Sequence, residues 1–76
     1  MYKMVEFLVK SIVDNPQAVE IKEIQGERVV IYEVKVDTSD VGKVVGRNGR
    51  IINSIRTIVR AAASKERKKV SIELMA

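Results

Sequence analysis

Three segments of the chain repeat apolar side chains at the spacing of an α-helix. Residues 3 to 14 carry them at Met4, Val5, Leu8, Val9, Ile12 and Val13. Residues 51 to 63 carry them at Ile51, Ile52, Ile55, Ile58, Val59, Ala62 and Ala63. A shorter apolar turn lies between these segments, at residues 41 to 45. Recurrence every three or four positions predicts three helices, each with one face against a core.

Three other segments alternate apolar and polar positions, which predicts half-buried strands. They are residues 18 to 24, 28 to 36 and 70 to 74. A glycine-bearing turn, Gln25-Gly26-Glu27, separates the first two, so these should form an antiparallel hairpin. The second strand is apolar on much of both faces and should lie inside the sheet. Two helices connect it to the third strand, a crossover long enough for those strands to be parallel.

The predicted order of elements is therefore α-β-β-α-α-β. This is an α+β fold with a three-stranded mixed sheet and three helices on one face. Asn15-Pro16 should end the first helix, because the residue before a proline disfavours the helical conformation. The segment Asp37 to Asp40 is rich in capping residues, and one of its two acids should cap the short second helix.

The composition removes several classes of chemistry. The chain has 76 residues, the size of one small domain, and contains no cysteine and no histidine. Disulfides, the usual zinc sites, thiol nucleophiles and imidazole acid-base catalysis are therefore excluded. We expect no metal and no cofactor. Because the sequence has neither a signal-peptide pattern nor a run of about eighteen apolar residues, we expect a cytoplasmic protein without a membrane span.

The net charge of +4 is concentrated in one half of the chain. Residues 43 to 69 contain nine basic residues and one acid, whereas residues 1 to 42 contain five basic residues and eight acids. Segregated positive charge is typical of proteins that bind nucleic acids, although charge runs are more often solvated surface. The basic half contains a glycine-bearing loop, and this coincidence favours the nucleic-acid interpretation.

The loop Gly46-Arg47-Asn48-Gly49 links the second predicted helix to the third. Gly46 can end one helix in a left-handed conformation, and Gly49 leaves the first turn of the next helix without a Cβ. The first amides of a helix lack internal partners and attract phosphate oxygens. Three cations surround this backbone: Lys43, Arg47 and Arg50. We therefore predict that the loop seats a sugar-phosphate chain, with the amides of residues 47 to 50 as donors.

The sequence Val-Val-Gly-Arg-Asn-Gly-Arg-Ile-Ile at residues 44 to 52 resembles the signature of KH domains. In those domains a G-x-x-G loop between two helices clamps about four nucleotides of a single strand. The order of elements resembles the type II KH fold and, with Asn-Pro after the first helix, the small bacterial KhpA family. The resemblance implies a single KH domain over residues 1 to 76. Its β-α-α-β core would span about 28 to 75, with the extra helix and strand at about 3 to 25.

The resemblance also implies a function. Members of the KhpA family are taken to be non-catalytic single-stranded RNA-binding proteins and RNA chaperones that affect cell shape in bacteria. A homodimer and a larger KH-containing partner resembling KhpB are implied in the same way. The positions that match the family's RNA-binding surface, or lie beside it on the third helix, are Lys43, Val45, Gly46, Arg47, Asn48, Gly49, Arg50, Asn53, Arg56 and Arg60. The last two either follow the RNA backbone or cover apolar surface with their stems.

Three alternatives remain open at this point. An enzyme is disfavoured, because the glycine patterns of P-loops and Rossmann turns and any Cys- or His-based nucleophile are missing. A protein-interaction module would place a partner helix in the groove, with exposed apolar residues such as Val44 in contact. A single-stranded DNA binder would use the same loop, since nothing identifies a contact to the 2′-OH. In each case the short loop between Ala63 and Val70 predicts a shallow groove.

Overall fold

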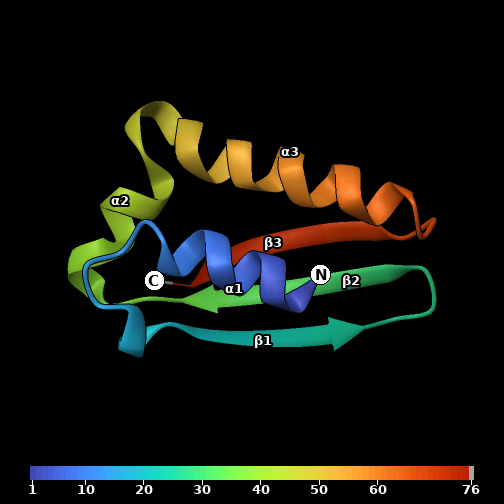
Figure 1. The fold of residues 1–76 in the computed structure, drawn as a ribbon, viewed down its shortest axis with the longest axis horizontal. Coiled ribbons are helices and arrows are strands. Elements are labelled where there is room, and N and C mark those ends of the chain that lie inside the picture. Colours follow the sequence, from blue (N-terminus) through green and yellow to red (C-terminus); the bar gives the residue numbers. More distant parts are fainter. Residues whose placement is uncertain (76) are drawn as a thin grey trace.

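A three-stranded sheet with helices on one side forms the fold (Figure 1). The structure is a computed structural model and describes residues 1 to 75. Its helices and strands are α1 (Tyr2–Lys10), β1 (Glu20–Gln25), β2 (Val29–Lys35), α2 (Val41–Val45), α3 (Arg50–Ser64) and β3 (Lys69–Met75). The predicted α+β class and the order α-β-β-α-α-β are confirmed. The longest helix, α3, has 15 residues, and no helix in the described residues has the length and apolar character that a bilayer crossing needs.

The strand β2 occupies the centre of the sheet, as its two apolar faces predict. It runs antiparallel to β1 and parallel to β3. Tyr32 of β2 therefore has Glu23 as its neighbour on β1 and Ile72 as its neighbour on β3. The helices α2 and α3 form the crossover that returns the chain to the parallel strand (Figure 1). The glycine loop lies in the middle of this crossover.

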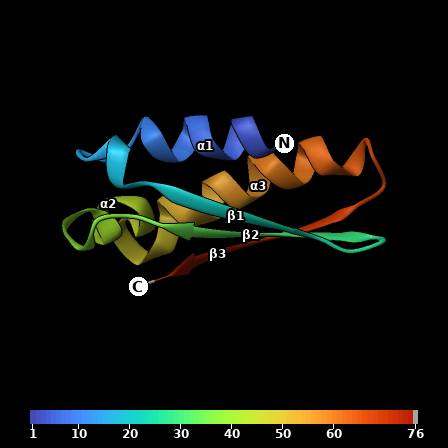
Figure 2. The same cartoon turned by 90° about the horizontal axis from the view of Figure 1, so that it is seen from below.

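The core lies between the sheet and the helices. Alternate residues of β2 face the helices, and Val30, Tyr32 and Val34 are at most 1% exposed. Buried residues of the two longer helices complete this layer: Val5, Val9, Ile52, Ile55, Val59 and Ala63. Figure 2 shows α1 and α3 over the same face of the sheet, with no helix on the other face. The short helix α2 packs against α3 at the end of the sheet where β2 finishes.

The first helix is shorter than predicted. It ends at Lys10, whereas its apolar spacing continues to residue 14 and Pro16 was expected to stop it. The amides of Asp14 and Asn15 donate to the carboxylate of Asp40, at 3.1 and 3.0 Å, instead of to helical carbonyls. A contact with a distant residue, which helical spacing cannot reveal, therefore sets the path of the chain after α1.

Burial differs from the prediction at several apolar positions. Ile51 is 36% exposed and Ile58 is 48% exposed, although both belong to the predicted apolar side of α3. A helix on a sheet buries a stripe only a little over about 100° wide, and these two isoleucines lie at its edge. Val44, which the interaction-module alternative needs at the surface, is fully buried.

Candidate nucleic-acid interface

The loop Gly46 to Gly49 turns the chain sharply between α2 and α3 (Figure 1). Positive φ angles occur at Gly46 (75°), Asn48 (56°) and Gly49 (74°). The ψ angle of 176° at Gly46 places it in an extended region, and not in the left-handed helical region that was predicted. Residues with a Cβ rarely adopt positive φ, and asparagine is one of the few that tolerate it. The backbone conformation thus accounts for the residue types at these three positions.

Gly46 is required by packing as well. A Cβ at residue 46 would lie 2.6 Å from Cγ1 of Ile51, far inside van der Waals contact. A Cβ at residue 49 would meet Nδ2 of Asn53 at 3.5 Å, which is an ordinary contact. Gly46 is therefore fixed by conformation and by close approach, whereas Gly49 is fixed by conformation alone.

The loop backbone offers fewer free donors than predicted. The amide of Gly49 donates to the carbonyl of Gly46 at 3.2 Å, and the amide of Arg50 donates to the carbonyl of Arg47. Two of the four predicted donors therefore serve the turn itself. The other two predicted donors are the amides of Arg47 and Asn48, whose side chains are exposed. Their contact with a ligand stays a prediction.

Lys43 is held by two acids beside the loop. Its ammonium group lies 2.5 Å from Oδ2 of Asp14 and 3.5 Å from Oδ1 of Asp40. The hydrogen bond to Asp14 raises the pKa of the Lys43 ammonium group. Lys43 therefore stays protonated, but carboxylates of the protein balance its charge. Its direct role is to tie α2 to the segment that follows α1, and its predicted part in RNA binding stays a prediction.

Asp40 ties the start of α2 to the segment that follows α1, a role that the sequence did not reveal. Its side chain is fully buried and accepts hydrogen bonds from the amides of Asp14 and Asn15, 26 and 25 residues away. Burial alone would raise the pKa of the Asp40 carboxyl group, but these two bonds and the charge of Lys43 outweigh it and lower the pKa. The predicted side-chain cap of α2 does not form, because Asp40 at its N-cap makes no capping hydrogen bond. Asp37 instead caps the 3-10 turn Thr38–Asp40 before α2, where its carboxylate accepts a hydrogen bond from the amide of Ser39 at 2.9 Å.

One flank of α3 faces the edge of β3. Nε and Nη2 of Arg56 donate to the carbonyl oxygen of Ile72, at 3.3 and 3.1 Å, and Nη1 donates to Oδ1 of Asn53 at 3.1 Å. Arg56 thus has a structural role, because its guanidinium group ties α3 to β3. Both of its partners are neutral groups, so its positive charge is not cancelled. The predicted contacts of Asn53 and Arg56 with RNA stay predictions.

Arg60, one turn further along the same flank, lines a hollow in the surface. The hollow has a volume of about 400 Å³ and is lined by Arg60, Lys68, Lys69 and Val70. We call it the basic hollow. Lys68 and Lys69 were not among the predicted site residues, although the basic run at residues 65 to 69 is the signal that could have pointed to them.

A sequence model of the KhpA/KhpB KH domain matches residues 2–74. The chain belongs to the KhpA/KhpB family of KH domains. The loop Gly46 to Gly49 lies within the matched residues, in the crossover between the consecutive helices α2 and α3. The family is not enzymatic, which removes the enzyme alternative.

The relatives of this KH domain match it over almost their full length. Two proteins named RNA-binding protein KhpA, from Caldanaerobacter subterraneus and Clostridium perfringens, are each 49% identical to it over 75 residues. These alignments cover 99% of this chain and 100% of each relative. The protein of the same name from Chlamydia trachomatis is 43% identical over 75 residues, which cover 99% of this chain and 96% of the relative. The suspected family is thus confirmed.

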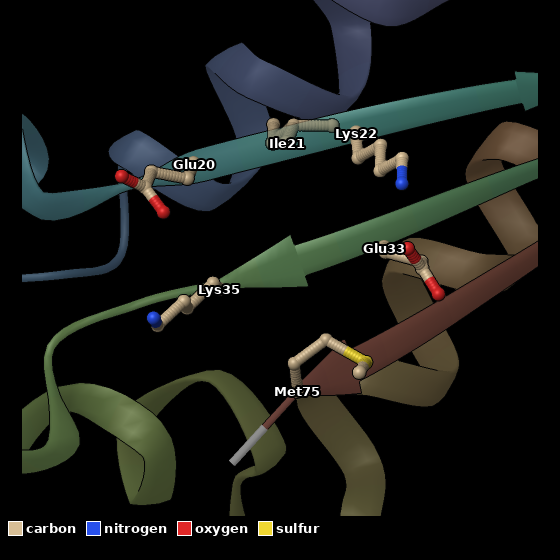
Figure 3. Close-up of a pocket in the computed structure, with 6 residues that line it drawn as sticks. All are labelled: Glu20, Ile21, Lys22, Glu33, Lys35 and Met75. Carbon is tan, nitrogen blue, oxygen red and sulfur yellow. The ribbon is translucent and has the colours of Figure 1, made fainter.

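The sheet face opposite the helices of this KH domain has balanced charge. Figure 3 shows a hollow on that face, with a volume of about 230 Å³ and side chains from all three strands. The strand register places Glu20 opposite Lys35 and Lys22 opposite Glu33. Neighbouring strands thus place acids opposite lysines on this face. This face therefore offers a polyanion no excess of positive charge, in contrast to the loop and the flank of α3.

Proposed function

We propose that this KH domain binds single-stranded RNA without catalysis, with the loop Gly46 to Gly49 against the sugar-phosphate backbone. The observation that carries this proposal is an exposed, preformed loop with arginines at residues 47 and 50, in a family whose relatives are named RNA-binding proteins. Neither arginine has a carboxylate partner among residues 1 to 75. Both guanidinium groups are therefore available to phosphate oxygens.

Binding at this loop combines charge with a fixed backbone. The planar guanidinium groups of Arg47 and Arg50 pair with phosphate oxygens through two parallel hydrogen bonds. The amides of Arg47 and Asn48 donate to the same backbone. Because the three positive φ angles already bend the loop, RNA binding costs little further ordering of the protein.

The bases lie between the loop helices and the edge of β3 in this arrangement. Val45 supports them with an apolar surface, and Asn53 and Arg56 supply polar groups along the flank of α3. The chain has only two tyrosines and one phenylalanine, and Tyr32 is buried, so stacking on aromatic side chains contributes little. We expect modest sequence preference, since most contacts reach the backbone.

The decisive experiment reverses the charge of the loop while both glycines are kept. The double variant Arg47→Asp/Asn48→Asp should bind a short labelled RNA at least about tenfold more weakly, because it loses charge-assisted contacts and adds like charge. Both side chains are exposed, so thermal stability should be unchanged. The variant Lys3→Asp/Gln17→Asp makes the same total change in charge at exposed positions outside the loop and is the control. Equal loss of affinity in both variants would contradict the proposal.

Three finer features belong to the same proposal. RNA should bind more tightly than single-stranded DNA of equal sequence, and equal affinity for both would reassign the loop to single strands in general. Weak binding to the RNA backbone is consistent with an RNA chaperone. The protein should therefore accelerate the annealing of complementary RNA strands. With cellular RNA as its ligand, we place the protein in the cytoplasm.

We also propose that the outer surface of α1 and α3 serves self-association or pairing with a larger KH-containing protein. Arg56 marks the flank of α3 that faces β3, so Ile51 and Ile58 lie on the flank away from that strand. Ile58 is 48% exposed and Phe7 of α1 is 69% exposed. Sedimentation velocity over a range of concentrations tests this: Phe7→Ser/Ile58→Ser should shift the wild-type association towards monomer. A wild-type protein that stays monomeric at the highest concentrations would exclude self-association.

A further inference from the structure

The basic hollow is held in a fixed shape by the turn between α3 and β3. The amide of Lys68 donates to the carbonyl of Ala63 at 3.3 Å, which closes the end of the helix. The amide of Lys69 donates to the carbonyl of Arg28 at 2.9 Å, which docks the start of β3 onto β2. Two consecutive lysines are thus fixed by their backbones next to Arg60.

The three cations of the basic hollow have no acidic partners. No carboxylate among residues 1 to 75 forms an ion pair with Arg60, Lys68 or Lys69, whereas Lys43 has two such partners. Glu66 lies in the same turn. The hydrogen bond from Tyr32 is the largest cause that lowers the pKa of Glu23, and the charge of Lys68 makes a smaller contribution. Neither acid is within pairing distance. Like charges around one hollow repel each other, and a bound anion would relieve that repulsion.

A line of polar side chains connects the basic hollow with the loop. Arg50, Asn53, Arg56 and Arg60 recur at intervals of three or four residues, so they share one flank of α3. The bonds from Arg56 to Ile72 show that this flank runs along the edge of β3. From Arg50 to Arg60 the helix rises about 15 Å. A strand that leaves the loop along this flank therefore reaches the basic hollow.

Resting on the function proposed above, we infer that the basic hollow is a second site for backbone phosphate of the same RNA strand. Its ligand is a phosphodiester group, which Arg60, Lys68 and Lys69 bind by charge and hydrogen bonds without base selection. The G-x-x-G loop holds about four nucleotides. At a stacked rise of about 3.4 Å, the distance of about 15 Å adds about four more. An RNA of about eight nucleotides engages both sites, and one of about four engages only the loop.

The experiment compares oligouridylates of about four and about eight nucleotides, followed by titration in NMR spectra that report on each backbone amide. The variant Lys68→Gln/Lys69→Gln removes two cations of the basic hollow. The variant Lys65→Gln/Arg67→Gln removes two cations of the same turn that do not line it, and is the control of equal charge. Lys65, Arg67 and Lys69 are exposed and Lys68 is half-buried, and thermal melting should show that both variants fold.

We expect Lys68→Gln/Lys69→Gln to bind the longer RNA at least about fivefold more weakly, with the shorter RNA unaffected. The log-log salt slope for the longer RNA should become shallower by about 1.4, the value for two phosphates of a single strand. The control should change both quantities much less. Equal losses in the two variants, or a loss that does not depend on RNA length, would overturn the second site. Failure of the wild type to bind either RNA would refute the loop proposal itself, so the two failures are distinguishable.

Discussion

Gly46 and Gly49 have the same spacing in the sequence as any G-x-x-G pair, but the structure gives them different tasks. Gly46 lets the backbone approach the side chain of Ile51, and this contact seats the loop on the first turn of α3. Gly49 only supplies the left-handed conformation that precedes the helix. The close approach joins the loop to α3, whose flank carries Arg56 and Arg60. A change at Gly46 should therefore disturb the whole surface.

The two glycines should differ in their tolerance of a methyl group. Gly46→Ala adds a steric clash to a backbone region that is nearly exclusive to glycine, and should lower the free energy of unfolding by about 2 to 4 kcal/mol. Gly49→Ala causes no clash, but its alanine has to adopt the left-handed conformation, which should lower the free energy of unfolding by about 1 to 2 kcal/mol. Urea unfolding followed by circular dichroism measures both. Equal costs would mean that the contact with Ile51 relaxes without penalty.

At the scale of elements, the end of α3 contains an unusual residue. The amide of Lys68 bonds to the carbonyl of Ala63, and the amide of Arg67 bonds to that of Ser64 at 3.2 Å. This is the Schellman pattern, which places a left-handed residue just after the helix. That residue is usually glycine, but here it is Arg67 with a φ of 58°. The turn that carries the basic hollow therefore contains backbone strain.

Replacement of that arginine should stabilise the protein. Arg67→Gly removes the cost of a left-handed residue with a Cβ, and this outweighs the larger conformational entropy that glycine gives the unfolded chain, for a net gain of about 0.5 to 1 kcal/mol. Lys65→Gly is the control, because Lys65 has helical angles of −65° and −27°. Glycine there should destabilise by about 0.5 to 1 kcal/mol. The midpoints of urea unfolding should move in opposite directions, and a shift of both to lower urea would contradict the role given to Arg67.

The spacing of apolar residues in the sequence predicted every helix and strand, because each of these elements packs one face against a common core. They could not locate contacts between distant residues. Asp37 or Asp40 was expected to cap the second helix, but the bonds of Asp40 to Asp14 and Asn15 depend on how α2 is placed against the end of α1. The same limit applies to Lys43, whose pairing with Asp14 depends on the tertiary fold. The glycine loop was visible because its conformation is local, whereas the basic hollow needs α3 and β3 side by side.

At the scale of the whole molecule, the charged side chains on the open face of the sheet differ in their surroundings from those along the loop and α3. On the open face of the sheet, the strand register places acids opposite lysines, so the charges there are balanced. Near the loop, Lys43 is balanced by Asp14 and Asp40. Arginines and lysines without ion-pair partners lie along the loop, the flank of α3 and the turn that follows it: Arg47, Arg50, Arg56, Arg60, Lys68 and Lys69. An RNA strand that follows this series meets positive charge from one end to the other.

The absence of histidine makes the pH dependence of RNA binding a sharp test of this arrangement. Arginine, lysine and carboxylate side chains ordinarily keep their charge between about pH 6 and about pH 9, and the chain has no histidine. RNA affinity should therefore change less than about twofold between about pH 6 and about pH 8.

With about three to six phosphates neutralised, RNA affinity should fall with salt on a log-log slope between about −2 and −4.

The variant Arg50→His supplies the positive control for this measurement. A histidine at that exposed position has an ordinary pKa near about 6.5. The variant should bind nearly as well as the wild type below about pH 6, where the imidazole is charged, and more weakly above about pH 7.5, where it is neutral. Fluorescence anisotropy with one labelled RNA follows both proteins across the range. A wild-type affinity that changed with pH as steeply as that of the variant would show that a titrating group controls the surface, and the series of permanently charged side chains could not then account for binding.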